Sequence, residues 1–432
     1  MFIVLFVLLV FGYPVAFTLG GVSLFFGLLT LGPNFFNLLP LRIWGVMSNY
    51  VLIAVPLFVY MGVMLEKSGL AEELLETMAL LFGRLRGGLA ISVVIVGALL
   101  AASTGIVGAT VVTMGLLSLP TMLKRGYSPE LASGTISAAG TLGQIIPPSI
   151  VLVLLGSILD VPIGDMFIGA VIPGLFLVTL YMLWIIFLAI FRPEQAPAMP
   201  SDELAKFKGV QAVSRVFTAF LPPFLLMVSV LGSIIAGIAS PTEAAAVGAM
   251  GATLLTILQK RFDLATLKAV MRETTLLTCM VFIILVGATS FGLVFRGLQG
   301  DTFLKELIIN ANLSSNMFLL LVMVIIFIAG FFIDFIEITF IIVPIVAPLF
   351  EHMGISLLWI GILIAMNLQT SFLTPPFGFS LFYLKGVAPP QVKTTHIYRG
   401  IIPFVVIQLI GLTLVILFPE TATRLPEIIL GR

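Results

Sequence analysis

The sequence carries very little charge for its length. Only 9% of its 432 residues are Asp, Glu, Lys or Arg, whereas 60% are hydrophobic and the mean hydropathy is +1.23. Soluble domains carry about 25% charged residues, so a soluble fold of this size could not cover so much apolar surface. The formal net charge of +1 also excludes a nucleic-acid-binding protein with a basic face. The composition therefore predicts a polytopic membrane protein.

Cysteine and histidine are almost missing from the sequence. The single Cys279 cannot form an internal disulfide or a cysteine-rich metal site. His352 and His396 lack the HxxE and HxxxH spacings of zinc sites. We therefore expect no transition metal. An intramembrane enzyme with Ser103 as nucleophile is disfavoured as well, because both histidines fall in polar segments away from Ser103, and we expect no catalytic residue.

What the sequence does contain is a long internal repeat. At one fixed offset, the stretch that begins with AASTG at 101–105 matches a later stretch, so that Gly126 aligns with Gly354. At the same offset Pro147–Pro148 aligns with Pro375–Pro376. Two long apolar segments that are interrupted by Gly, Pro, Ser and Thr at matching places indicate a binding site near the middle of the membrane. The pattern therefore indicates a secondary transporter.

The repeat divides the chain into two halves. We expect the first repeat over 1–191, a linker with one unpaired span over 192–239, and the second repeat over 240–432. The elements expected in the first repeat are scaffold spans within 1–65 (1–31 and 44–65), a surface helix over 69–87, a hairpin over 89–120, a broken helix over 131–158 and a span over 166–191. Those expected in the second are spans within 242–295 (242–259 and 275–295), a surface helix over 300–311, a hairpin over 316–349, a broken helix over 356–384 and a span over 399–419.

The two hairpins are expected to re-enter the membrane rather than cross it. Residues 89–120 are uncharged and much longer than the roughly 20 residues that one span needs, and small residues around 103–105 weaken the helix in the middle. The positive-inside rule, by which Lys and Arg are more frequent on the cytoplasmic side of a membrane, gives a second argument. Lys and Arg divide more unevenly between the two sides of the membrane if the hairpins turn back than if they cross. With nine crossings, the N-terminus is cytoplasmic, the C-terminus is outside and the second repeat is inverted. The expected fold class is an all-α polytopic membrane protein with two inverted-topology repeats.

The hairpin tips and broken helices offer oxygen atoms as ligands. Proline has no N–H and clashes with the preceding turn, so each proline pair opens its helix and frees carbonyl groups. Oxygen ligands with little formal charge suit a monovalent hard cation such as sodium, and the N-termini of half-helices suit a carboxylate. The side chains that supply these oxygens are Ser103, Thr104, Thr141, Gln144, Ser149, Gln369, Thr370, Ser371 and Thr374.

Asp334 and Glu337 are the acidic residues of the second hairpin. An ionisable residue within the membrane is a functional candidate by default, so Asp334 is expected to bind sodium or carry a proton. The alternative is that one or both lie in an aqueous cleft and only orient the tip. Glu243, at the start of a span, is either functional or an ordinary acid in the first turn of a helix.

Four motifs together resemble one transporter family. AASTGIVGATVVTMG, TLGQIIPPSI, SPTEAAA and LQTSFLTPPFG are similar to segments of the large membrane subunit (DctM-like) of tripartite ATP-independent periplasmic (TRAP) transporters, and the resemblance covers essentially the whole chain. The STG and DFIEI tips resemble the branch labelled for mannitol and chloroaromatic compounds.

The resemblance implies a sodium-driven, elevator-type transporter in the bacterial inner membrane. It implies a small membrane subunit of about four spans and a periplasmic binding protein that delivers an organic acid. One sodium site would combine Ser103–Gly105 with Pro147–Ser149. The other would combine the tip around Asp334 with Thr374–Gly378. The first tip departs from the commoner serine- and glycine-rich tip of the family, and the second tip carries acids, which leaves the exact sodium ligands and a proton contribution open. A self-sufficient sodium- or proton-coupled carboxylate carrier of the same architecture is the alternative function.

Overall fold

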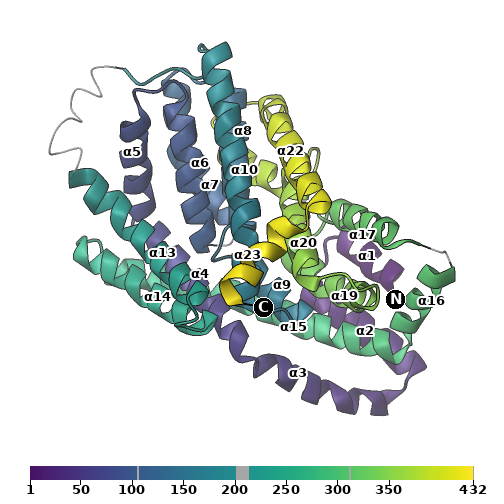
Figure 1. Cartoon of the computed structure of the whole chain (residues 1–432). Coiled ribbons are helices and arrows are strands. Elements are labelled where there is room, and N and C mark those ends of the chain that lie inside the picture. Colours follow the sequence, from purple (N-terminus) through teal and green to yellow (C-terminus); the bar gives the residue numbers. More distant parts are fainter. Residues whose placement is uncertain (105–106, 201–213, 311–312, 432) are drawn as a thin grey trace.

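The computed structural model describes residues 1–104, 107–200, 214–310 and 313–431, and every regular element in these ranges is helical. Figure 1 shows a group of helices that run side by side, roughly from the top to the middle of the view. This group contains α6 (Gly88–Thr104), α7 (Val107–Lys124), α8 (Pro129–Thr141), α10 (Ile163–Phe191) and α22 (Thr394–Leu417).

A second group of helices lies across the lower end of the first (Figure 1). It includes α2 (Val15–Thr30), α3 (Leu39–Met47) and the 34-residue α15 (Leu264–Gly297). Beside it, α4 (Ala54–Lys67) packs against α14 (Pro241–Leu258), and α13 (Leu221–Ile235) packs on α14.

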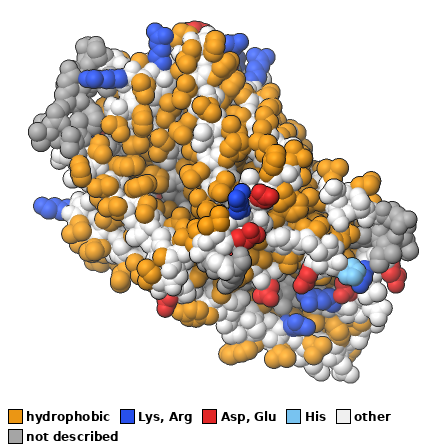
Figure 2. All heavy atoms as spheres, viewed as in Figure 1, with side chains coloured by type: hydrophobic (Ala, Val, Ile, Leu, Met, Phe, Trp, Pro, Cys, Tyr) orange, Lys and Arg blue, Asp and Glu red, His pale blue; other side chains and the backbone are white. Residues whose placement is uncertain are grey.

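Much of the surface is apolar, as expected for contact with lipid. Figure 2 shows hydrophobic side chains over most of the visible flank, with Lys and Arg gathered at the upper edge. Within the described ranges, seven helices are long and apolar enough to cross a membrane, or up to eight if a bent pair counts as one. The bent pair is α18 (Phe335–Ile341) with α19 (Val343–His352), which meet at 50°. The broken crossings contain shorter helices outside this set, so nine crossings stays a prediction.

The helix bounds recur along the chain. Thr141 and Gln369 are 228 residues apart, and adding this offset to the bounds of α7 gives the first residue of α18 and the last of α19. The same offset relates α8 and α9 (Ile150–Leu159) to α20 (Leu357–Leu373) and α21 (Phe379–Val387) within a few residues. The sequence repeat is therefore also a repeat of helices.

Several expected helix bounds are wrong. Residues 1–31 form two helices, α1 (Phe2–Val10) and α2, because Gly12 adopts φ +82° and Pro14 cannot continue a helix from the preceding turn. Residues 44–65 are likewise interrupted, since α3 ends at Met47 and α4 begins at Ala54. Between them Asn49 starts a short 3-10 helix by accepting a hydrogen bond of 3.0 Å from the Val51 N–H.

The helix that contains the span expected over 275–295 begins before residue 275. Helix α15 begins eleven residues earlier, at Leu264, because the side chain of Asp263 caps it. The Thr266 N–H donates to this carboxylate and holds the pKa of Asp263 below its usual range. After α22 the chain forms a further helix, α23 (Glu420–Leu430), which the sequence analysis did not predict. In the second repeat, α16 (Gly300–Asn310) and α17 (Ser315–Ala329) precede the bent pair.

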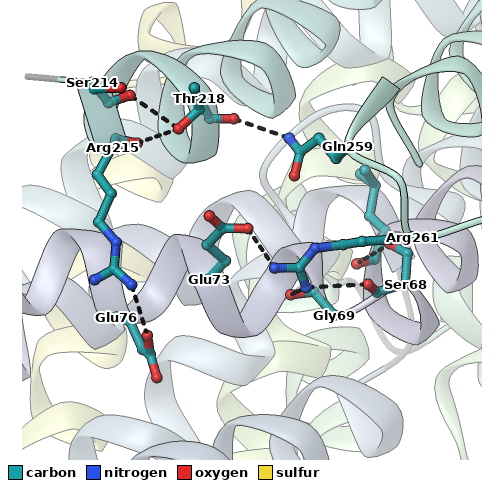
Figure 3. A network of polar contacts seen from close by, with 10 residues as sticks. Ser68, Gly69, Glu73, Glu76, Ser214, Arg215, Thr218, Gln259 and Arg261 are labelled. Atoms are coloured by element: carbon teal, nitrogen blue, oxygen red, sulfur yellow. Dashed lines mark hydrogen bonds and ion pairs between the residues drawn. The ribbon is translucent and has the colours of Figure 1, made fainter. Parts of the chain in front are cut away.

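A polar network holds the corner between α4 and α5 (Leu70–Phe82), as Figure 3 shows. Arg261, in the turn between α14 and α15, donates to the Gly69 carbonyl at 2.9 Å and to Glu73 on α5 at 2.6 Å. Arg215 lies 3.9 Å from Glu76 on the same helix. The opposite face of α5 packs on α6. The network fixes the direction in which α5 leaves α4, while a position of α5 at the membrane surface stays a prediction.

Candidate functional site

The first helix break separates α8 from α9. Pro147 and Pro148 are joined by a cis peptide bond and have no N–H, so the carbonyls of Gly143 and Gln144 lose their usual helical donors. The Ser149 hydroxyl replaces one of these donors and bonds the Gln144 carbonyl at 2.9 Å. The side-chain amide of Gln144 is fully buried, and its nitrogen and oxygen have no hydrogen-bond partner in the described part of the chain.

The second break separates α20 from α21 at Pro375–Pro376, again with a cis peptide bond. The Thr374 hydroxyl bonds back to the Thr370 carbonyl at 2.8 Å, and the Gly378 N–H donates to the Thr374 carbonyl at 3.0 Å. The Ser371 hydroxyl bonds the Leu368 carbonyl at 2.8 Å. The predicted polar residues at this break thus satisfy nearby backbone groups in this conformation.

Each hairpin packs directly on the break of its own repeat. A Cβ on Gly143 would collide with the Ala101 carbonyl near the end of α6, and a Cβ on Gly330 would collide with the Ser371 hydroxyl. These approaches leave no room for a side chain. They place Ala101 of α6 next to the first break and Gly330, at the end of α17, next to the second.

The two broken helices meet each other through Thr141, at the end of α8, and Gln369 on α20. The Gln369 amide nitrogen donates to the Thr141 hydroxyl at 3.4 Å, and both side chains are fully buried. The Gln369 amide oxygen has no partner among the described residues. Thr370 faces elsewhere, because its hydroxyl bonds the Met366 carbonyl at 2.8 Å and lies 3.4 Å from Gln408 on α22.

Asp334 and Glu337 cap the start of α18. The Phe335 N–H donates to the Asp334 carboxylate at 2.7 Å, and the Asp334 N–H donates to the Glu337 carboxylate. This capping box satisfies two N–H groups at the end of a helix. Both carboxylates keep further lone pairs for a cation, so the structure gives them a structural role and leaves the proposed role in transport open.

Tyr383 is a candidate that the sequence analysis missed. Its ring lies 2.9 Å from where a Cβ of Gly108 would sit, which places it against the first hairpin. The side chain is 43% exposed. The sequence signal that could have identified this residue is a tyrosine shortly after a helix break, within an apolar segment.

Some other predicted residues lie outside the part of the chain that the structure describes, and one has a simpler role. Gly105 and the side chains of Ser103 and Thr104 are outside the described residues. Glu243 closes an exposed capping box with Ser240 at the start of α14, which supports the reading of an ordinary first-turn acid.

The unpartnered oxygens define what the site can bind. Among the described residues, Gln144 next to the first break and Gln369 on α20 each carry a buried side-chain oxygen without a hydrogen-bond partner. Leaving such groups unsatisfied costs about 1–3 kcal/mol each, which a cation ligated by oxygen would offset. Amide oxygens are hard ligands, which suit a hard cation. In the same ranges no group of three or more His, Cys, Asp or Glu could hold a metal ion.

Comparison with known proteins gives one consistent family. The model of the tripartite ATP-independent periplasmic transporter DctM component matches residues 2–421. The C4-dicarboxylate TRAP transporter large permease protein DctM of Pseudomonas aeruginosa is 32% identical over 408 residues, which are 94% of this chain and 93% of the relative. The sialic acid TRAP transporter large permease protein SiaM of Vibrio cholerae is 28% identical, covering 97% and 96%. The ectoine TRAP transporter large permease protein TeaC of Halomonas elongata is 30% identical, covering 87% and 86%.

Two solved transporter structures share the fold. The Alcanivorax borkumensis YdaH transporter superposes with a TM-score of 0.65 at 15% identity, over 91% of this chain and 90% of that one. MtrF of Neisseria gonorrhoeae gives a TM-score of 0.58 at 13% identity, over 89% and 84%. Identities this low show a common fold and nothing more.

Proposed function

Because the chain belongs to the family of the DctM component of tripartite ATP-independent periplasmic transporters, we propose that it imports an organic acid across the bacterial inner membrane in symport with sodium. Within this family it is the large permease subunit. The observation that carries the proposal is the meeting of two proline-broken helices at Thr141 and Gln369, where the Gln369 amide oxygen is buried without a partner among the described residues. Unwound backbone and half-helix ends at mid-membrane are how secondary transporters hold coupling ions.

The starts of α9 and α21 favour a substrate that carries a carboxylate. Helices α9 and α21 both begin at a break, after Ser149 and Gly378, and among the described residues neither start has a side-chain cap. Uncapped N–H groups and the positive end of the helix dipole favour an anion. The relatives named for C4-dicarboxylates, sialic acid and ectoine all handle compounds with a carboxylate. Tyr383, which lies against the first hairpin, would offer its hydroxyl to this substrate.

The proposed motion is an elevator. The hairpins and broken helices would move together as the transport domain, because they are packed on one another at Gly143 and Gly330. The other spans would form a scaffold together with a small membrane subunit of about four spans. A periplasmic binding protein would deliver the substrate, and the N-terminus would be cytoplasmic and the C-terminus periplasmic.

Uptake into proteoliposomes tests this function. The chain is reconstituted with and without the small subunit and the loaded binding protein, and each mixture is assayed with and without an inward sodium gradient. We expect uptake only when all three proteins and sodium are present. Uptake of a carboxylate by this chain alone would instead establish a self-sufficient carrier. Uptake driven by a proton gradient without sodium would overturn the sodium coupling.

A further inference from the structure

A cavity of about 490 Å³ lies where α10 ends and where α8 and α22 begin. The turn after α10 is joined to the start of α8, because the Ser128 N–H donates to the Gln195 carbonyl at 3.1 Å. Helix α22 reaches the same place, since a Cβ on Gly400 would collide with the Glu130 carbonyl. Direct backbone contacts between these helix ends therefore hold the walls of the cavity.

The cavity carries charges of both signs. Arg192 and Arg399 line it, and neither makes an ion pair within the ranges that the structure describes. Glu130 also lines it, 4.0 Å from the ring nitrogen of His396. Two guanidinium groups and one carboxylate thus face a common space, and the arginines are free to bind an external anion.

The cavity lies where an apolar helix surface gives way to polar residues. Helix α10 is apolar over a length that crosses a membrane, and the side chains of Phe187 and Phe191 near its end are 48% and 68% exposed. The rings of Trp184 and Phe187 stack with centroids 5.6 Å apart, and both residues line the cavity. Aromatic residues followed by arginine are typical of the boundary between lipid tails and headgroups. Figure 2 shows Lys and Arg at this end of the molecule above a hydrophobic flank.

We propose that this cavity binds the headgroup of an aminophospholipid of the phosphatidylethanolamine class. Arg192 and Arg399 bind the phosphate, because a guanidinium presents paired donors that match phosphate oxygens. The ammonium group donates to the Glu130 carboxylate, and an acyl chain lies along Trp184 and Phe187. A headgroup with a phosphate but no amine would leave Glu130 facing an anion. A choline headgroup has no N–H to donate to it.

Lipid binding to the purified full-length chain tests the proposal. Delipidated protein is titrated with phosphatidylethanolamine, phosphatidylglycerol or phosphatidylcholine of the same acyl chains, and bound lipid is counted by native mass spectrometry. Phosphatidylethanolamine is expected to bind most tightly. Arg192→Gln and Arg399→Gln should each weaken it about fivefold, the effect of one basic residue beside a lipid phosphate. Glu130→Gln should remove the preference for phosphatidylethanolamine over phosphatidylglycerol.

Three controls make the result specific. Arg42→Gln removes an exposed arginine elsewhere and should leave binding unchanged. His396→Gln removes the neighbour of Glu130 but keeps the carboxylate, so the lipid preference should remain. Arg399→Lys keeps the charge without the paired donors and should bind with intermediate strength, which guards against misfolding of the glutamine variants. Equal lipid binding by the wild type and both arginine variants would overturn the proposal. So would binding of inorganic phosphate to these arginines without any binding of lipid.

Discussion

The amide of Gln369 donates to the hydroxyl of Thr141 at 3.4 Å, and the two residues are separated by the offset of the sequence repeat, 228 residues. Residues related by an approximate twofold axis meet each other where they lie on that axis. A second pair behaves in the same way, since the Gln408 amide donates to the Tyr181 hydroxyl at 2.6 Å across 227 residues. Both contacts are fully buried. They are the contacts expected if the two repeats are inverted relative to each other.

Thr141→Val tests whether this contact serves transport or only packing. The contact is long, and hydrogen bonds between membrane helices contribute about 0.6 kcal/mol on average, so thermal unfolding should change little. Sodium-driven uptake should fall sharply if the hydroxyl belongs to the ion or substrate site. Thr141→Ser keeps the hydroxyl and should transport normally. Normal uptake by the valine variant would make Thr141 a packing residue.

The two helix breaks at the centre of the fold could be predicted from the sequence, because proline disrupts a helix by its own covalent structure. Pro147–Pro148 and Pro375–Pro376 remove helical donors wherever they occur, and the repeat places them in register. The break at Gly12–Pro14 has a similar signal, but the apolar run continues through it and hides it. The helical stretch before residue 275 was missed because its polar residues resemble a loop, although Asp263 caps a helix there. Tyr383 has no motif around it, and its position depends on how the hairpins pack.

Asp334→Asn separates the charge of this residue from its role as a helix cap. Asparagine caps a helix about as well as aspartate, so α18 should still begin at Phe335 and expression should not change. Sodium-driven uptake should fall at least about tenfold, which corresponds to a loss of ~1.4 kcal/mol. Asp263→Asn is the matched control, because it makes the same change at the cap of α15, outside the candidate site. Unchanged sodium dependence in Asp334→Asn would remove this carboxylate from the mechanism.

Replacing Pro147–Pro148 by Ala–Ala should stop transport. The change restores two N–H donors and removes the clash with the preceding turn, so α8 and α9 can join and the carbonyls at the break are bonded within the helix. Uptake and elution as a monodisperse protein are measured together. Pro120→Ala is the control, because Pro120 lies inside the continuous helix α7. Undiminished uptake by the Ala–Ala variant would show that the break is not the site.

Tyr383→Phe tests the residue whose ring lies against the first hairpin. If its hydroxyl binds substrate, the concentration that gives half-maximal uptake should rise about two- to tenfold, the range for one hydrogen bond. Tyr60→Phe removes a hydroxyl that lies 3.0 Å from Thr253, on α14, and should leave this concentration unchanged. An identical uptake curve for Tyr383→Phe and the wild type would exclude the hydroxyl from substrate binding.

Thr113 and Glu66 join the first hairpin to the spans around it. The Thr113 hydroxyl on α7 donates to the Glu66 carboxylate on α4 at 2.8 Å, and the Glu66 side chain is 11% exposed. The second carboxylate oxygen of Glu66 has no partner in the described part of the chain, so this carboxylate depends on Thr113 and on Lys67 at 3.6 Å. If α7 moves relative to α4 during transport, the contact stabilises the conformation seen here and must break.

Thr113→Val should therefore destabilise this conformation. Leaving a buried carboxylate without its donor costs about 1–3 kcal/mol, so amide hydrogen exchange along α7 should speed up and the thermal midpoint should fall. The control is Thr121→Val on the same helix, because the Thr121 hydroxyl bonds only the Leu117 carbonyl of its own helix. Faster exchange with retained or faster uptake would mean that breaking this contact limits the motion. Slower uptake in proportion to the loss of stability would mean that the contact only holds the fold together.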